Sequence, residues 1–192
     1  MSLENDPERS SHAAIAVAII GAGPLGRWLA LAAARAGFRV MLEDVMPSNL
    51  HHAQEELRRQ LSPANPSAAL DRIAFVSSIE DAVREADLVI DCVPDELESK
   101  LEILWLLDRM APPRTVLATP TTKLSITDLA CCTYRPERCI AIALDPRTFW
   151  RAPEAGSIQL RSTPLTDSAA LSLVREFWET LGFAVNAEEA LA

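Results

Sequence analysis

The sequence predicts an α/β protein: a doubly wound, mostly parallel sheet in a single domain. Apolar runs alternate with helical patterns along most of the chain, which is typical of βαβ units. The first apolar run ends in a glycine-rich turn, GAGPLG, at residues 21–26. The length of 192 residues lies in the range of one domain and is enough to bury a large core. Polar residues 1–13 are expected to form a flexible tail, and residues 14–192 the domain.

The alternation assigns six strands and five helices before residue 145. The strands are expected at 15–20, 39–43, 73–76, 88–92, 115–118 and 139–144. The helices are expected at 24–36, 48–61, 79–85, 95–110 and 125–131. Two prolines in the segment SPANPSAAL separate the second helix from the third strand.

The pattern changes after Asp145, where PRTFWRAPEAGS has two prolines and no clean period and is expected to be a loop. A short strand at 157–161, a helix at 167–181 and an edge strand at 183–185 follow. Phe149 and Trp150 lie in the loop beside prolines, where aromatic side chains can mark a self-association surface. An ordinary place in the core is the alternative for both.

Composition excludes several function classes. Lys and Arg total 18 against 27 for Asp and Glu, with no basic stripe that could bind a nucleic-acid backbone. No apolar run approaches the ~20 residues of a membrane helix, and the first dozen residues lack the apolar core of an export signal. The cysteines have no zinc-ligand spacing, so we expect no metal and reduced thiols in the cytoplasm: Cys92, Cys131, Cys132 and Cys139.

The glycine turn has the spacing of a dinucleotide-binding loop. Gly21 follows an apolar strand and permits a tight turn, Gly23 lets the backbone approach a pyrophosphate, and Gly26 lets the helix pack closely on the strand. Pro24 and Leu25 complete the loop, and Pro24 lies in the first helical turn, where its missing N–H has no consequence. The helix N-terminus then faces the phosphates. The loop therefore predicts a Rossmann-type fold.

An acidic residue follows the second strand. Asp44 lies 18 residues after Gly26, close to the ~20 expected for the carboxylate that binds the adenine ribose. A carboxylate repels a 2′-phosphate, and the following VMPSN offers no Lys or Arg, so NAD is favoured over NADP. Alternation along the strand argues against Glu43 pointing the same way. A glycine turn kept for packing, with an acid facing solvent, is the alternative.

The chain resembles the NAD-binding domain of the 3-hydroxyacyl-CoA dehydrogenases from about residue 15 to 186. Five segments agree in order and spacing with the family's pattern. They are GAGPLG with Asp44, ADLVIDCVPDELESK, LATPTTKLSITDLA, PERCIAIALDP and STPLTDSAALSLVREFWETLG. The resemblance implies NAD as cofactor and a 3-hydroxyacyl-CoA or a related hydroxy acid as substrate.

The resemblance also assigns residues on the nicotinamide side. Asp95 and Lys100 stand where the family has a Glu and a Lys that contact the cofactor, and both are expected to face one cleft. Thr122 stands where the family has a Ser hydroxyl near the substrate carbonyl, while Lys123 and Pro120 replace a Ser and an Asn. Val93, Thr122 and Asp145 complete the expected cofactor contacts. An exposed charge pair is the alternative for Asp95 and Lys100.

The family's catalytic histidine is absent from this sequence. Its place before Asn-Pro is taken by Ile142, Ala143 or Leu144, and Asp145 replaces the Asn. The Glu that orients the histidine is replaced by Gln159.

Other residues near these positions do not restore the pair. Glu154 offers an alternative alignment for the orienting Glu, although it lies in the Pro/Gly-rich loop. His51 and His52 lie near the adenosine end, on what is expected to be a solvated helix face.

The family's C-terminal helical domain, which forms the dimer and closes over the acyl-CoA, has no counterpart in this sequence. A homodimer or a partner subunit could then supply that wall of the cleft. Three functions stay open: an NAD-dependent oxidoreductase with Thr122 or Lys123 as candidate catalytic residues, a dinucleotide-binding sensor or accessory subunit without hydride transfer, and another Rossmann enzyme. A lysine could replace the histidine base only if burial lowered its pKa.

Overall fold

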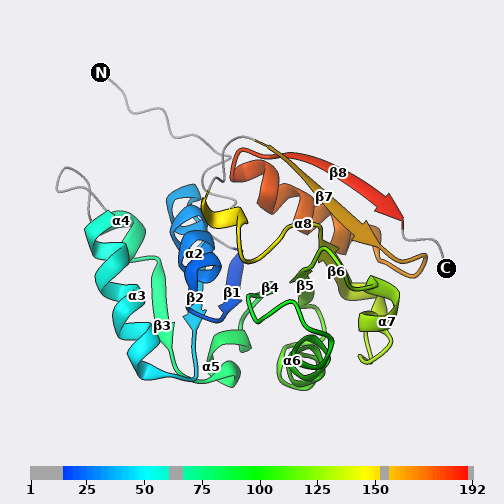
Figure 1. Ribbon diagram of the computed structural model, residues 1–192, viewed down its shortest axis with the longest axis horizontal. Coiled ribbons are helices and arrows are strands. Elements are labelled where there is room, and N and C mark those ends of the chain that lie inside the picture. Colours follow the sequence, from blue (N-terminus) through cyan, green and yellow to red (C-terminus); the bar gives the residue numbers. More distant parts are fainter. Residues whose placement is uncertain (1–14, 61–66, 152–155, 190–192) are drawn as a thin grey trace.

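The computed structural model describes residues 15–60, 67–151 and 156–189, and in them eight strands form one sheet (Figure 1). The strand order is β3-β2-β1-β4-β5-β6-β7-β8. The bounds are β1 Ala16–Ile20, β2 Arg39–Glu43, β3 Ile73–Val76, β4 Leu88–Asp91, β5 Val116–Pro120, β6 Cys139–Ile142, β7 Ser157–Ser162 and β8 Ala184–Glu189.

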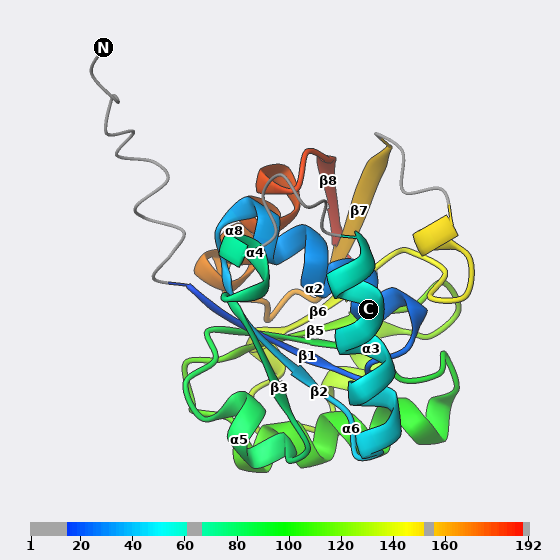
Figure 2. The same ribbon diagram turned by 90° about the vertical axis from the view of Figure 1, so that its left-hand side faces the viewer.

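Helices connect the strands and cover both faces of the sheet (Figures 1 and 2). The α-helices are α2 Pro24–Ala36, α3 Pro47–Gln60, α4 Ser67–Leu70, α5 Ile79–Val83, α6 Leu97–Met110, α7 Ile126–Ala130 and α8 Ser168–Thr180. Two short 3-10 helices are η1 Pro136–Arg138 and η2 Phe149–Arg151.

Strands β1 to β6 are parallel, and the two strands beyond them differ in direction. Strand β7 is antiparallel to β6 and parallel to β8. Strand β1 pairs with both β2 and β4, so the chain reverses its direction of travel across the sheet at this point. The fold is therefore the predicted doubly wound sheet, and the carboxyl ends of β1 and β4 form its switch point.

Two apolar cores lie on the two faces of the sheet. One lies under α2, α3, α4 and α8, and the other lies under α5, α6 and α7. Alternation along β1 supplies both, because Val17 and Ile19 point to the first core while Ala16, Ala18 and Ile20 point to the second. In the parts of the chain described, no helix has both the length and the apolar character needed to cross a membrane.

The structure corrects the expectations at three places in the chain. The last strand is longer than the predicted 183–185, and α4 was not predicted. Phe149 is not an exposed contact residue, because its ring lies 5.2 Å from that of Trp28, 5.8 Å from Trp178 and 5.7 Å from Phe183. The loop therefore places an aromatic side chain against the first core.

Candidate functional site

The glycine loop joins β1 to α2 at the switch point. Gly21 has a φ of +103°, in the left-handed region that favours glycine, and its N–H donates to the Glu43 carbonyl at 2.8 Å. A Cβ on Gly26 would lie 1.9 Å from the Gly21 carbonyl oxygen, so no side chain fits there. A Cβ on Gly23 would meet no atom within 4 Å. Space is therefore open beside the residue predicted to lie against the pyrophosphate.

The carboxylate of Asp44 holds the glycine loop next to the start of α3. Its Oδ2 accepts from the Ala22 N–H at 3.0 Å, and its Oδ1 accepts from the Met46 N–H at 2.9 Å and the Asn49 side chain at 3.0 Å. The side chain is only half-buried. The structure thus places Asp44 at the loop, where its carboxylate anchors the loop to the start of α3. Its contact with an adenine ribose stays a prediction.

Glu43 has a different environment, although it is the neighbour of Asp44 in the sequence. Its side chain is buried, and alternation along β2 places it with Met41 on the face covered by α5. Burial, with a smaller contribution from the charge of Asp44, raises the pKa of Glu43 from 4.5 to about 7. The two acids therefore point to different sides of β2, as alternation along the strand predicted, and the ribose contact of Asp44 stays a prediction.

Arg27 is a residue of the loop region that sequence reasoning missed. Its Nη1 donates to the Ala22 carbonyl at 3.0 Å, and its Nε lies 2.8 Å from a carboxylate oxygen of Glu56 on α3. The sequence search for a cation considered the segment after Asp44 and overlooked the residue directly after Gly26. A guanidinium therefore lies beside the loop, with Glu56 as its counterion.

Lys100 is buried in the interior. Its side chain and that of Asp91 are both 0% exposed, and its Nζ lies 2.5 Å from Asp91 Oδ1. This corrects the expectation that Asp95 and Lys100 face one cleft: Asp91, at the end of β4, supplies the counterion that a buried ammonium requires. A role of Lys100 in cofactor binding stays a prediction. Burial and the charge of Asp91 also raise the pKa of the neighbouring Cys92 thiol far above its usual range.

Asp95 connects the ends of β4 and β5. Its Oδ2 accepts from the Thr122 N–H at 3.3 Å, while its Oδ1 is buried without a hydrogen-bond partner among the described residues. The Thr121 hydroxyl accepts from the N–H groups of Lys123 and Leu124, which fixes the turn after β5. The side chains of Thr122 and Lys123 are exposed. The structure thus brings together Asp95 and Thr122, two residues that were each predicted to contact the cofactor.

The end of β6 lies opposite the start of β7. The Ala143 N–H donates to the Gln159 carbonyl at 2.8 Å, which continues the antiparallel register in which Ile142 pairs with Leu160. Ile142 and Leu160 are buried in the core, whereas Ala143 is half-buried and Gln159 is exposed. The side chain of Gln159 donates to Glu188 on β8. The positions expected for a histidine and its orienting acid are therefore cross-strand neighbours.

Asp145 begins the turn after β6. Its Oδ1 accepts from the Arg147 N–H at 2.9 Å, and its carbonyl accepts from Thr148 and Phe149. Glu154, the alternative orienting acid, lies outside the described residues. His51 and His52 are exposed on α3, each beside a glutamate four residues later, as expected for a solvated helix face.

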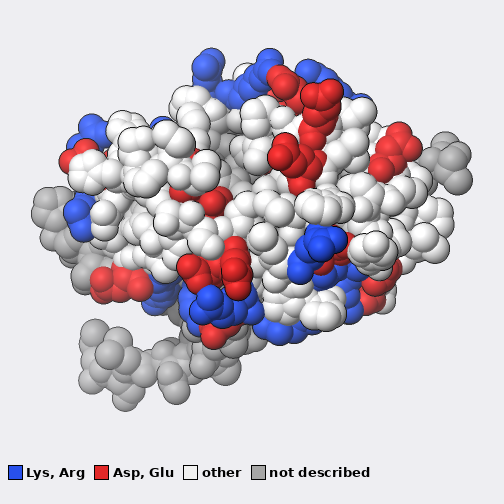
Figure 3. All heavy atoms as spheres, turned by 90° about the horizontal axis from the view of Figure 1, so that it is seen from below, with Lys and Arg blue, Asp and Glu red and all other residues white. Residues whose placement is uncertain are grey.

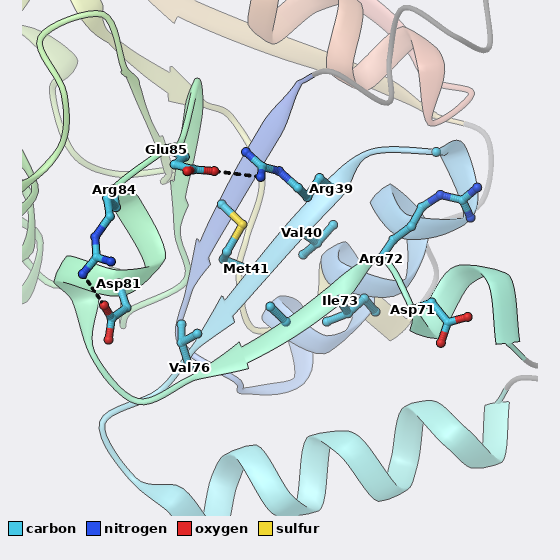
Figure 4. A pocket seen from close by; sticks show the side chains of 12 residues that line it. Arg39, Val40, Met41, Asp71, Arg72, Ile73, Val76, Asp81, Arg84 and Glu85 are labelled. Carbon is cyan, nitrogen blue, oxygen red and sulfur yellow. Dashed lines mark hydrogen bonds and ion pairs between the residues drawn. The ribbon is translucent and has the colours of Figure 1, made fainter.

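Two cavities lie on the face covered by α5 and α6, and neither includes the glycine loop. One of about 630 Å³ lies over β2 and β3, where the five-residue α5 leaves part of the sheet uncovered (Figure 4). Two of its three lining arginines form ion pairs there: Arg39 lies 2.7 Å from Glu85, and Arg84 lies 2.6 Å from Asp81. The other, about 330 Å³, runs between α5 and α6 and includes Val93, predicted as a cofactor contact.

Sequence comparison with families matches residues 16–182 to the NAD-binding domain of 3-hydroxyacyl-CoA dehydrogenase. A 3-hydroxybutyryl-CoA dehydrogenase of Bradyrhizobium diazoefficiens is 33% identical over 183 residues, 90% of this chain and 60% of that protein. A probable 3-hydroxybutyryl-CoA dehydrogenase of Bacillus subtilis is 33% identical over 66% of this chain and 47% of that protein. The chain thus spans about half of the length of these relatives.

Solved structures agree with the sequence matches. The 3-hydroxybutyryl-CoA dehydrogenase of Escherichia coli K12 superposes with a TM-score of 0.80 at 26% identity, over 91% of this chain and 38% of that one. A diketoreductase superposes with a TM-score of 0.79 at 26% identity, over 93% of this chain and 65% of that one.

Proposed function

Since the chain belongs to the 3-hydroxyacyl-CoA dehydrogenase family and contains its NAD-binding domain, we propose that it binds NAD(H) at the glycine loop and oxidises 3-hydroxyacyl-CoA substrates slowly or not at all. The slow or absent oxidation is proposed because Ala143 and Gln159, a cross-strand pair, occupy the positions expected for the catalytic histidine and its orienting acid. Neither side chain can take a proton from a substrate hydroxyl. The proposed setting is the cytoplasm, where the cysteines, all free in the described chain, stay reduced.

The residues present fit the adenosine and pyrophosphate parts of the cofactor. Gly23 borders open space, and the first-turn N–H groups of α2 have no partner within the helix, so they can donate to phosphate oxygens. Asp44 can accept from ribose hydroxyls. The free acceptor on Asp95 Oδ1 fits a hydroxyl or amide donor on the nicotinamide side. When bound, NAD⁺ supplies the acceptor for a hydride from a secondary alcohol.

The chain's own residues would have to move the proton in that reaction. Removing a hydroxyl proton requires a positioned base, which is typically worth about 10² to 10⁴ in rate. Lys123 is exposed and lacks the burial that a lysine base requires, and Thr122 is no base. Asp145 is engaged in its own turn, and if ionised near the substrate oxygen it would repel developing negative charge.

Turnover by a residue of this chain is the second candidate function. Its support is the family itself, because the similar proteins are named as dehydrogenases of 3-hydroxybutyryl-CoA. In that function, Thr122 and Lys123 at the end of β5 would contact an acyl-CoA, and a second subunit would supply the remaining wall of the cleft.

A coupled pair of measurements separates the two functions. The protein is titrated with NADH by calorimetry, and NADH absorbance is followed with acetoacetyl-CoA as substrate. We expect saturable NADH binding with turnover far below the typical enzyme range of about 1 to 10³ per second. Turnover within that range would contradict the proposal, and loss of that turnover in Lys123→Met or Thr122→Val would identify the acting residue. Absence of NADH binding would overturn the first part.

A further inference from the structure

Arg27 is a cation in the first turn of α2 that is hydrogen-bonded to the backbone of the glycine loop. Its Nη1 donates to the Ala22 carbonyl at 3.0 Å, and the Ala22 N–H in turn donates to Asp44 Oδ2 at 3.0 Å. One residue of the loop therefore separates the guanidinium from the carboxylate that is proposed to bind the adenine ribose. A guanidinium near that ribose is the group with which a 2′-phosphate pairs in NADP-binding folds of this type.

Glu56 on α3 neutralises this guanidinium. Its Oε2 lies 2.8 Å from Arg27 Nε, and the side chains of Arg27 and Glu56 are only 17% and 26% exposed. Salt screens such a pair less than it screens charges on the open surface. The Gln60 side chain donates to the other oxygen of Glu56, Oε1, at 3.2 Å. The carboxylate is therefore held from two sides, with one oxygen next to Arg27.

The overall charge of the chain does not favour a nucleotide with an additional phosphate. Asp and Glu total 27 against 18 for Lys and Arg. On the face formed by α5, α6 and α7, groups of both signs lie among uncharged side chains (Figure 3). A net acidic chain does not attract the more highly charged nucleotide. Among the described residues, Arg27 is the one cation with a hydrogen bond to the glycine loop, so its local partner matters most.

We propose that Glu56 determines the choice between NAD(H) and NADP(H), because it holds the Arg27 guanidinium in an ion pair that cannot compensate the charge of a 2′-phosphate. This inference rests on the proposed binding of NAD(H) at the glycine loop and adds a residue to its selectivity. Arg27 by itself would favour NADP(H), whereas Asp44 favours NAD(H). The ion pair with Glu56 resolves this conflict in favour of Asp44.

The same geometry gives the result of removing the charge of Glu56. The guanidinium would keep its hydrogen bond to the Ala22 carbonyl and would therefore stay beside the loop. Its positive charge would no longer be compensated, and it could pair with a 2′-phosphate. NADH has no 2′-phosphate and would gain no such contact. The effect therefore appears in the difference between the two nucleotides.

Calorimetric titration of the full chain with NADH and with NADPH tests this role through the ratio of the two dissociation constants. Glu56→Gln keeps the side-chain size and an acceptor for Gln60, and should lower the ratio of the NADPH constant to the NADH constant about tenfold. Arg27→Met should raise the ratio, because Glu56 then repels the 2′-phosphate without a counterion. Glu55→Gln is the matched control and should leave the ratio unchanged, since Glu55 is 60% exposed and lies beside His51.

The double variant Arg27→Met/Glu56→Gln shows whether Glu56 acts through Arg27. Its ratio should return to within about threefold of the unmodified value, because the charge that Glu56→Gln exposes is then absent. A lower fraction of folded protein affects both nucleotides equally and does not change the ratio.

Three results would overturn the role of Glu56 while NADH binding, and with it the proposed function, stands. They are an unchanged ratio in Glu56→Gln, an equal shift in Glu55→Gln, and a shift that persists in the double variant. If the unmodified protein bound neither nucleotide, the proposed function would fall and this inference with it.

Discussion

Glu43 and Asp44 are neighbours in the chain and have opposite environments. Asp44 is half-buried and accepts three hydrogen bonds, one from the glycine loop and two from the start of α3. Glu43 is buried at the carboxyl end of β2. The carboxylate that stays accessible is suited to a ribose. The buried one keeps its proton up to a pKa of about 7, because removing a carboxylate from water favours its protonated state.

The raised pKa of Glu43 predicts a stability that falls with pH. Between 4.5, its ordinary pKa, and about 7, its pKa in the fold, the folded chain retains a proton that the unfolded chain has released. Stability from this group therefore falls as pH rises through that window, by about 3 kcal/mol in all. Urea unfolding at pH 5 and pH 8 should show this fall for the unmodified protein relative to Glu43→Gln. Equal pH dependence of the two proteins would refute it.

The cross-strand pair Ala143 and Gln159 indicates which substitutions should restore proton transfer. Ala143→His alone should gain little activity, because Gln159 is neutral and cannot stabilise an imidazolium. Ala143→His with Gln159→Glu places base and orienting acid on neighbouring strands, and NADH oxidation with acetoacetyl-CoA should exceed that of the single variant by about tenfold or more. Ala143→Asn with Gln159→Glu controls for side-chain size. Equal rates for the single and double histidine variants would show that the acid does not orient the base.

At the scale of elements, the loop between β1 and α2 is constrained on one side and open on the other. The Gly21 carbonyl leaves no room for a Cβ on Gly26, whereas space is open at Gly23. Glycine is therefore required at the two positions for different reasons. At Gly26 it allows the helix to pack on the strand, and at Gly23 it leaves room for a ligand.

Alanine substitutions at these two glycines should separate folding from binding. Gly26→Ala should destabilise the fold by about 3 kcal/mol or more, because the helix must move away from the strand. Gly23→Ala should change stability by about 1 kcal/mol or less and weaken NADH binding, since the added methyl enters the open space. Chemical unfolding and calorimetric titration measure the two effects. Unimpaired NADH affinity in Gly23→Ala would contradict the assigned role.

A buried ion pair joins β4 to α6. Lys100→Met leaves Asp91 as an isolated charge in the core and should destabilise the protein by about 3 to 5 kcal/mol. Adding Asp91→Leu should recover most of that loss, because the remaining pair is apolar. Urea unfolding of the single and double variants checks this. If the double variant were no more stable than Lys100→Met, lost packing and not the unpaired charge would be the cause.

At the scale of the whole molecule, apolar periodicity predicted the parallel strands and the order of helices, because buried strands need long apolar runs. The glycine spacing likewise predicted the loop and the place of Asp44. Both patterns depend on residues that are close together in the sequence, so they predict local structure without knowledge of the tertiary contacts.

Tertiary pairings could not be predicted in the same way. Spacing suggested Asp95 as the companion of Lys100, but the interior offered Asp91 as its counterion. Phe149 looked exposed in a proline-rich loop, yet the first core holds it. Arg27 reaches the loop from the following helix. The contacts of Phe149 join segments that are distant in the sequence. Those of Lys100 and Arg27 join residues nine and five positions apart, and they depend on how each helix is oriented relative to the preceding strand.

Calorimetric titration of the unmodified chain with NADH and with NADPH tests the central claim most directly. We predict one saturable NADH site, weaker binding of NADPH because Asp44 repels a 2′-phosphate, and a loss of about 1 to 3 kcal/mol of NADH binding free energy in Asp44→Ala. Asp44→Asn, which retains an acceptor oxygen, separates the charge from the loop hydrogen bonds. Tighter binding of NADPH than of NADH, or no binding of either, would contradict the assignment of this loop as an NAD site.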